Sequence, residues 1–394
     1  MSPRRLLVMT PRELTRDVRA RRQVEAAREA GLEVLGLSAV LRGETPLALP
    51  GIEVARVPGD RLSAPLRRLG LGGFRQSHPV LHELRGLWRL VRLGKTTIRL
   101  VRAARGLGRF DLVHVNDFDA LPAGYLIARR SAAPLVYDAH ELYRAAEAEP
   151  PRLWAAVVAG VEGWIGRRAR AVVTNCDPFA RELDTMLRLR RPATVVLNCP
   201  DPVPELPASA GPGGPLRVIY QAGGDHESRP VADLLVAAEH APGAVITIRL
   251  VYVEREQLEV EIAARGLSGR VVVSDPVAPD RLVEGLTGYD VGVILNRDTI
   301  PNVALAVPGK LWEYMMAGLG TVAPALPGLA LVDELGVGVT FPPGEPEELG
   351  RRLQALAEDR EALAAMQAQA RTLALERFNS VTQAAQLREV WQAA

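Results

Sequence analysis

The stretch Asn198-Cys-Pro-Asp-Pro-Val-Pro-Glu-Leu-Pro-Ala-Ser-Ala-Gly-Pro-Gly-Gly-Pro215 divides the chain into two similar halves. Proline and glycine are dense here, and both interrupt helices and central strands, so residues 201–215 are predicted to be a linker. A chain of 394 residues is also too long for one ordinary core. We therefore predict two domains, residues 1–200 and 216–377.

Short apolar runs alternate with helical patterns on both sides of this linker. Before it, the expected strands are Leu6–Met9, Glu33–Leu37, Asp111–Val115, Leu135–Tyr137, Ala171–Thr174 and Thr194–Leu197. After it, they are Leu216–Tyr220, Val245–Val251, Arg270–Val273, Val291–Leu295, Gly320–Ala323 and Val337–Phe341. Helices are expected at Val231–His240, Glu254–Arg265, Lys310–Ala317 and Pro346–Arg377. This alternation predicts the α/β class, with two doubly wound, Rossmann-like parallel sheets and a ligand crevice between their carboxyl ends.

The composition indicates a globular protein of a reducing compartment. Hydrophobic residues make up 48% and charged residues 24%, and the net charge is +2. The two cysteines, Cys176 and Cys199, cannot build a disulfide framework, and no Cys/His cluster has zinc spacing. The first apolar run is too short for a signal peptide or a membrane helix, so a cytoplasmic location is expected.

One expected helix carries an unusual charge pattern. No acidic residue occurs between Glu83 and Asp111, whereas basic residues recur at Arg85, Arg89, Arg92, Lys95, Arg99, Arg102, Arg105 and Arg109. A second face holds Leu87, Trp88, Val91, Ile98 and Val101, and this face is expected to pack against the sheet. A solvated surface explains the basic stripe, and so does peripheral contact with an anionic membrane or a phosphorylated acceptor. Nucleic acid is not expected, because no aromatic residues or binding motif accompany the charge.

Two segments of the second half are typical of phosphate binding. In Pro308-Gly-Lys-Leu-Trp-Glu-Tyr-Met-Met-Ala-Gly318 a Pro-Gly turn leads into a helix, whose free N–H groups suit a diphosphate. Lys310 adds a positive charge, Leu311 follows it, and Glu313 can accept hydrogen bonds from two ribose hydroxyls. A structural interpretation, in which Glu313 caps the helix and Lys310 faces solvent, explains these two residues equally well. In Tyr220-Gln-Ala-Gly-Gly-Asp-His-Glu-Ser-Arg-Pro230, Gly223 and Gly224 allow close approach of a ligand and Arg229 precedes a helix, although an ordinary turn also fits.

Two segments of the first half place polar residues at strand ends. They are His114-Val-Asn-Asp-Phe-Asp119 and Leu135-Val-Tyr-Asp-Ala-His-Glu-Leu142. Reactive groups in doubly wound sheets lie at such positions, so Asp117, Asp138, His140 and Glu141 are candidates for substrate contact. A hydrogen-bonded structural histidine and a metal ligand are the alternatives for His140.

Taken in order, these segments resemble glycosyltransferase family 4, of the GT-B fold, over nearly the whole chain. The likeness is to a branch with a "YDAHEL"-type motif in the first domain and "P-x-K-L-x-E-Y-M-x-x-G" in the second. The segment Thr15–Gln23 also fits, and so does the end of the chain, where residues 378–394 resemble the helix that crosses back to the first domain.

The resemblance implies that the second domain binds a nucleoside-diphosphate sugar and the first binds a small-molecule or lipid-linked acceptor. Arg229 matches the family's basic residue on the pyrophosphate, Glu313 the second glutamate of its Glu-X7-Glu motif, and His140 the histidine near the donor sugar. Leu305 stands where the first glutamate is expected. Pro11–Asp17 replaces the family's glycine-rich loop, which leaves Arg16 as an acceptor-side candidate.

The resemblance further implies retention of anomeric configuration without a metal or other cofactor. Arg229, Lys310 and a helix N-terminus can stabilise the departing diphosphate. Retention then implies that the acceptor attacks the sugar from the side on which the diphosphate leaves. Asp117-Phe-Asp119 is similar to the Asp-X-Asp metal motif of the other large glycosyltransferase fold, which has one nucleotide-binding domain and is discounted here. The alternative functions are a nucleotide-sugar epimerase or hydrolase of this fold, and a non-catalytic nucleotide-binding partner protein. The donor base and sugar and the acceptor remain open.

Overall fold

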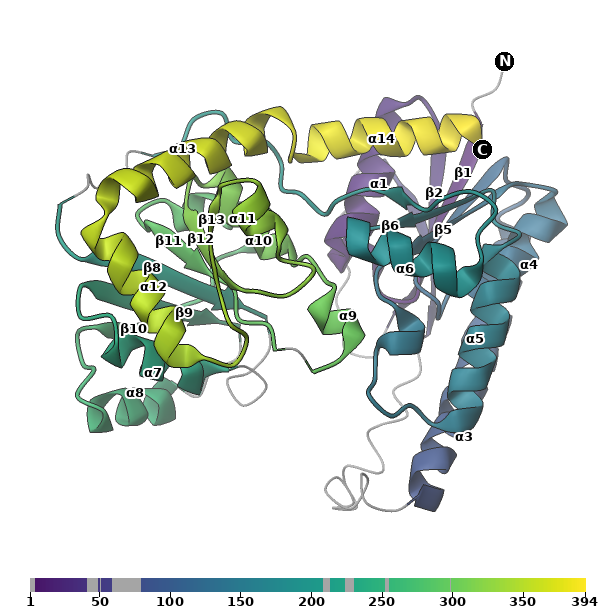
Figure 1. Ribbon diagram of the computed structural model, residues 1–394. Coiled ribbons are helices and arrows are strands. Elements are labelled where there is room, and N and C mark those ends of the chain that lie inside the picture. Colours follow the sequence, from purple (N-terminus) through teal and green to yellow (C-terminus); the bar gives the residue numbers. More distant parts are fainter. Residues whose placement is uncertain are drawn as a thin grey trace. The chain divides into compact units, whose positions relative to one another are not determined.

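The chain folds into two compact units in this computed structural model, which describes residues 4–40, 49, 51–58, 79–207, 213–223, 230–251, 255–297 and 299–394 (Figure 1). The first unit comprises Met1–Leu197, Ile300–Asn302 and Gln383–Ala394. The second comprises Asn198–Thr299 and Val303–Thr382. The second unit thus begins at Asn198, where the proline-rich segment starts.

A seven-stranded parallel sheet forms the centre of the first unit, in the order β3-β2-β1-β4-β5-β6-β7. Its strands are β1 (Arg5–Thr10), β2 (Glu33–Val40), β3 (Glu53–Pro58), β4 (Leu112–Asn116), β5 (Leu135–Ala139), β6 (Ala171–Thr174) and β7 (Thr194–Val195). Its helices are η1 (Leu14–Arg16), α1 (Val18–Glu29), α3 (Pro79–Gly106), α4 (Leu121–Ser131), η2 (Tyr143–Ala145), α5 (Arg152–Gly166), α6 (Asp177–Leu187) and α14 (Ser380–Ala393). The strand order reverses between β1 and β4, which is where such sheets bind ligands.

The second unit repeats this plan with six parallel strands in the order β10-β9-β8-β11-β12-β13. They are β8 (Leu216–Ala222), β9 (Ala244–Leu250), β10 (Val271–Ser274), β11 (Val291–Val293), β12 (Gly320–Pro324) and β13 (Gly338–Phe341). The helices are α7 (Val231–Glu239), α8 (Arg255–Ala264), η3 (Pro279–Arg281), η4 (Glu284–Leu286), α9 (Pro301–Ala304), α10 (Gly309–Met316), α11 (Leu331–Glu334), α12 (Pro346–Glu358) and α13 (Arg360–Glu376). The prediction of two doubly wound α/β sheets is confirmed.

The return of the last helix to the first unit is also confirmed. Leu387, Val390 and Trp391 of α14 are buried in the same core cluster as Leu6 and Val8 of β1. The indole Nε1 of Trp391 donates a hydrogen bond of 3.0 Å to Nδ1 of His114. The crossing begins after Phe378, whose ring still stacks on Trp312 of the second unit at 4.8 Å between centroids.

Two elements differ from expectation. The predicted helix Pro346–Arg377 is two helices, because Asp359 leaves the helical conformation and its carboxylate caps α13 at the N–H of Ala362. The strand β3 was not predicted. It lies at the edge of the sheet, where only some side chains are covered, so its apolar pattern is weak.

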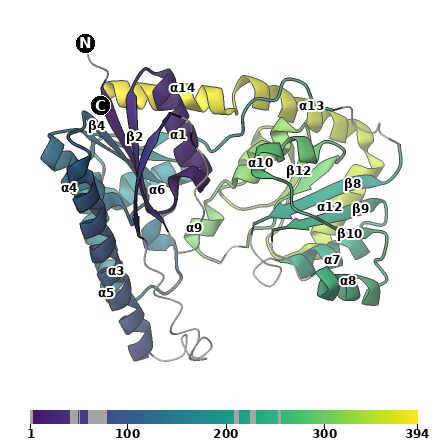
Figure 2. The same cartoon turned by 180° about the vertical axis from the view of Figure 1, so that it is seen from behind.

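The basic helix α3 lies alongside α5 in both views (Figures 1 and 2), but the apolar face predicted to pack is the wrong one. Leu93, Leu100 and Ala104 are the buried residues. In contrast, the exposed fractions of Leu87, Trp88, Val91 and Ile98 lie between 41% and 51%. The helix therefore has two apolar faces, of which one remains exposed in the described part of the chain.

Candidate active site

Two polar segments meet at the carboxyl edge of the first sheet. Asn116 ends β4, and Asp138 lies in β5 directly opposite it in the parallel register. The backbone N–H of Asp117 donates to the carbonyl of Asp138 at 2.9 Å. Asp117 has a φ of +65°, in the left-handed region that aspartate tolerates better than most residues. This turn directs the following residues, from Phe118 onward, into the helix α4.

The centre of this edge is the carboxylate of Asp138, which is fully buried. Arg19 of α1 donates to both of its oxygens, from Nε at 2.8 Å and from Nη2 at 2.9 Å, and Gln23 donates from Nε2 at 2.7 Å. Burial alone raises the pKa of a carboxyl group, but here Arg19 outweighs it and holds the pKa of Asp138 well below its usual value. Asp138 is therefore a positioning residue, since its side chain is closed to an acceptor.

The side chains of Asn116 and Gln23 connect this ion pair to His140. They exchange two amide hydrogen bonds, of 2.8 and 2.9 Å, and Asn116 Nδ2 also donates to the carbonyl of Met9 at 3.0 Å. Asn116 Oδ1 lies 3.0 Å from Nε2 of His140. Because that oxygen can only accept, His140 carries a proton on Nε2.

The second ring nitrogen of His140 faces a carboxylate. Nδ1 lies 3.4 Å from Oδ1 of Asp117, and the side chain of His140 is 18% exposed. Burial lowers the pKa of a histidine, but Asp117 and Asp138 outweigh it and raise the pKa of His140. The imidazole is thus held in one orientation with one edge accessible, as a group that contacts substrate must be.

The structure also describes the other candidates of the first unit. Glu141 follows His140 and is exposed, Arg16 is exposed at the end of η1, and Asp117 is 5% exposed. His114 is fully buried. Its Nε2 lies 3.6 Å from Asp138, and its Nδ1 accepts the hydrogen bond from Trp391. Within the described ranges, no group of three or more histidine, cysteine, aspartate or glutamate side chains is placed to hold a metal ion.

In the second unit, the two predicted phosphate-binding segments meet at the carboxyl end of β8. Gln221 Nε2 donates to Oε2 of Glu313 at 2.8 Å, and the Lys310 ammonium lies 5.1 Å from the centroid of the Tyr220 ring. Gln221 is itself approached by Arg249 of β9, whose Nη1 lies 3.5 Å from Oε1. The lysine is therefore held in the first turn of α10 and the glutamate about one turn further along.

Close packing fixes this helix on the sheet. The hydroxyl of Tyr314 donates to the carbonyl of Val293 at 3.2 Å, and a Cβ at Gly292 would lie 2.3 Å from the Tyr314 ring. Leu311 is fully buried and its N–H donates to the carbonyl of Pro308, so its side chain supports the donor site only by packing. Gly223 follows β8 directly. Gly224 and Arg229 lie outside the described residues, and their roles stay predictions.

Four residues of these sites were not identified from sequence: Arg19, Gln23, Asn116 and Arg249. A signal existed for two of them, since Arg19 and Gln23 are four residues apart on one face of α1 and are both buried. A buried arginine requires a partner, and the buried Asp138 provides it. For Arg249, in the middle of an apolar strand, the same reasoning applies, and its partners are Gln221 and the carbonyl of Gly285.

Comparison with known proteins identifies the architecture. Residues 20–202 match the family model described as Glycosyltransferase Family 4. The first domain belongs to this family. A sequence search against curated proteins finds no significant match.

Solved structures of the GT-B fold align with nearly the whole chain. Sucrose-phosphate synthase from Thermosynechococcus elongatus has a TM-score of 0.72 at 17% identity, covering 99% of this chain and 98% of that one. The Anabaena protein HepE in complex with UDP-glucose has a TM-score of 0.68 at 18% identity, covering 99% and 100%. The lipopolysaccharide outer core galactosyltransferase WaaB has a TM-score of 0.64 at 11% identity, covering 99% of both chains. The first unit thus matches the glycosyltransferase family 4 model, and the chain as a whole has the GT-B fold of these structures.

The raised pKa of His140 makes a testable contribution to stability. A raised pKa in the folded state means that folding favours the protonated ring. The advantage of the wild-type protein over His140→Gln should be fully present below pH 6.5, the ordinary histidine pKa, and be lost as the pH rises through the folded-state pKa. Chemical unfolding of both proteins from about pH 5 to pH 9 measures this difference.

The control is His240→Gln, which changes an exposed histidine of the second unit. A free-energy difference for His140→Gln that is independent of pH, or that grows toward alkaline pH, contradicts the electrostatic role of Asp117 and Asp138.

Proposed function

We propose that the chain transfers a sugar from a nucleoside-diphosphate sugar to an acceptor hydroxyl, with retention of configuration and without a metal ion. The observation that carries this proposal is the N-terminal half of α10, where Lys310 and Glu313 are held beside the end of β8. A lysine near a helix N-terminus suits a diphosphate, and a carboxylate one turn away suits the two ribose hydroxyls. HepE, which shares the fold, is known in complexes with UDP and UDP-glucose, so UDP is the first nucleotide to test, with GDP the second.

The proposed reaction needs no protein nucleophile. The bond from the anomeric carbon to the β-phosphate oxygen breaks, and negative charge accumulates on that phosphate, where Lys310, Arg229 and the start of α10 stabilise it. The acceptor oxygen bonds to the anomeric carbon on the same face, and the departing phosphate oxygen takes its proton. His140, fixed through Asn116 and Asp117, contacts the transferred sugar. This role rests on the family resemblance of the segment that contains it.

The donor site is tested by two kinds of substitution. Lys310→Ala and Arg229→Ala should each lower turnover by about 100-fold or more, as does loss of a charge contact to the transition state. Glu313→Ala should chiefly weaken binding of UDP, and Glu313→Gln should weaken it less, because the amide still accepts one hydroxyl. Initial rates with UDP-glucose and calorimetric titration with UDP measure both effects.

The matched control is Arg181→Ala, which removes one exposed positive charge away from the proposed sites. Normal rates in both Lys310→Ala and Arg229→Ala would contradict the phosphate assignment. Donor turnover in the absence of any acceptor would favour the epimerase or hydrolase, and binding of nucleotide without any turnover would favour the non-catalytic partner.

Metal independence has its own test. The positive charge for the leaving diphosphate is assigned to side chains and to a helix N-terminus, so transfer should continue at full rate in excess chelator. Loss of activity in chelator, with recovery on addition of magnesium or manganese, would contradict the proposal and restore Asp117 and Asp119 as metal ligands.

For the acceptor, we propose a lipid-linked molecule reached through the exposed face of α3. One stripe of this helix runs through Leu84, Trp88, Val91 and Ile98, all more than 40% exposed, and continues through the exposed basic residues Lys95, Arg102 and Arg105. Such a helix lies in a membrane interface, with apolar side chains in the acyl region and cations at the lipid phosphates. In the described part of the chain, no helix is both long and apolar enough to cross a bilayer.

Other basic residues of α3 are used within the first unit. Arg85 and Arg89 form ion pairs with Glu147, and Arg92 pairs with Asp119. The basic stripe expected from sequence is therefore only partly available to a membrane, through Lys95, Arg102 and Arg105.

Sedimentation with vesicles tests this contact. The protein should bind phosphatidylglycerol vesicles and not phosphatidylcholine vesicles, and high salt should release it. Lys95→Gln/Arg102→Gln/Arg105→Gln should abolish binding, whereas Arg85→Gln/Arg89→Gln/Arg92→Gln, which changes equal charge on paired residues, should retain most of it. Recovery in the supernatant under every condition would contradict the membrane contact and favour a small soluble acceptor.

A further inference from the structure

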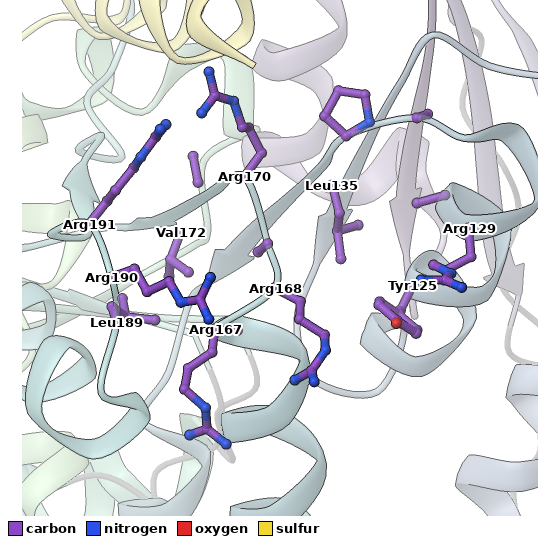
Figure 3. A pocket seen from close by; sticks show the side chains of 16 residues that line it. Tyr125, Arg129, Leu135, Arg167, Arg168, Arg170, Val172, Leu189, Arg190 and Arg191 are labelled. Carbon is purple, nitrogen blue, oxygen red and sulfur yellow. The ribbon is translucent and has the colours of Figure 1, made fainter.

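The first unit contains a cavity that lies away from the candidate active site. It has a volume of about 490 Å³ and is formed where β5 and β6 begin, by Pro134, Leu135, Ala171 and Val172 together with the chain connections around them (Figure 3). His140 and Asp138 lie at the other end of β5. Since a strand rises roughly 3.3 Å per residue, the start of β5 and His140 are separated by roughly 16 Å. The cavity is therefore distinct from the edge of the sheet that carries the proposed chemistry.

Arginine dominates the wall of this cavity. Of its sixteen lining residues, six are arginines and, among these described residues, none is an aspartate or a glutamate. The arginines come from the last turn of α4, from the turn between α5 and β6, and from the loop after α6 (Figure 3). They are Arg129, Arg167, Arg168, Arg170, Arg190 and Arg191.

Helix termini explain three of these arginines, one of which, Arg129, lies in the last turn of α4. Cations are favourable at helix C-termini, and Arg167 donates to the carbonyl of Leu187 at 3.1 Å while Arg168 donates to that of Trp164 at 3.0 Å. Arg168 also lies over the Trp164 ring, at 4.1 Å from its centroid. The other three arginines of the cavity have no ion-pair partner among the described residues.

This arrangement is unfavourable without a counter-ion. Like charges that converge on one concave surface repel each other, and the repulsion destabilises the ligand-free unit. An unpaired cluster in a cavity is the arrangement expected of a site for an anion.

Guanidinium geometry indicates which anion. Its planar donors match the oxygens of a phosphate in pairs, and such contacts are among the strongest hydrogen bonds in proteins. One phosphate carries about two negative charges, too few to neutralise three unpaired arginines. The volume also exceeds that of a single phosphate and lies in the range of small-molecule sites, ~300–1,000 Å³.

We propose that this arginine cavity binds an oligophosphate, a ligand with two or more phosphate groups, at a site separate from the donor site. The ligand is either a soluble oligophosphate or the phosphorylated headgroup of a lipid, and both present the same chemistry to the arginines.

Calorimetric titration with inorganic tripolyphosphate tests the site directly, in a Lys310→Ala/Glu313→Ala background that weakens the proposed donor site. We expect one equivalent to bind, with an affinity that falls steeply as salt rises. Arg170→Gln/Arg190→Gln/Arg191→Gln should weaken binding at least about 30-fold, since three charge-assisted contacts are lost. The matched control is Arg21→Gln/Arg152→Gln/Arg181→Gln, which removes equal charge from the same unit outside the cavity and should leave binding nearly unchanged.

Two further measurements separate the outcomes. The melting temperature of the ligand-free cavity variant should equal or exceed that of the wild-type protein, because repulsion between the arginines is relieved. A lower melting temperature together with unchanged tripolyphosphate binding would overturn the proposal. Vesicles containing cardiolipin, whose headgroup carries two phosphates, identify the source when tested with the α3 substitutions already in place. Binding of vesicles but not of tripolyphosphate, lost in the cavity variant, assigns the site to a lipid headgroup.

Equal binding of both probes by the wild-type protein, the cavity variant and the control would also overturn the proposal. The site is independent of the proposed function: failure of UDP to bind, with tripolyphosphate binding that depends on the cavity arginines, would contradict the donor assignment alone.

Discussion

The buried ion pair between Arg19 and Asp138 constrains the first unit more than any other interaction. Its two members lie in α1 and in β5, 119 residues apart, and both guanidinium contacts are shorter than 3 Å. Removing one partner of such a pair leaves an uncompensated buried charge, at a cost of about 3–5 kcal/mol. Arg19 also donates to the carbonyl of Val196, so the same guanidinium holds α1, β5 and the chain just after β7. The position of His140 follows from this pair, because Gln23 contacts both Asp138 and the Asn116 amide that orients the imidazole.

The strand order explains why these distant segments meet. In both sheets the first strand of the unit lies centrally, and the chain winds outward on one side before it returns to the other. Sheets with this strand order bind ligands at the carboxyl edge, beside the point where the order reverses. Motifs that are separate in sequence become neighbours there: Tyr220 and Gln221 approach Lys310 and Glu313 although roughly ninety residues lie between them. The same geometry brings Asn116 beside His140.

Local patterns predicted the parts of the fold that depend on local physics. Buried parallel strands are continuous apolar runs, and a Pro-Gly turn before an amphipathic segment marks the start of α10, so these were identified. The helix α14 was expected from the family resemblance, and the hydrogen bond from Trp391 to His114 attaches it to the first unit. The edge strand β3 was missed, since half of its side chains face solvent and its pattern is mixed. Asp138 was predicted to contact substrate because the end of a strand is usually accessible. Its carboxylate is instead covered by Arg19, and a contact between residues so far apart produces no periodic pattern in the sequence.

Charge shows the same limit of local reasoning. The net charge of +2 suggests a nearly neutral surface, yet the chain divides its arginines into three environments. Arg19 neutralises a buried carboxylate, Arg85 and Arg89 pair with Glu147, and six arginines line one cavity. A sequence count cannot distinguish these environments, because an ion pair depends on which helix lies next to which loop. The arginines of the cavity have no ion-pair partner among the described residues, and a folded unit that retains such a cluster is expected to meet its counter-charge on another molecule.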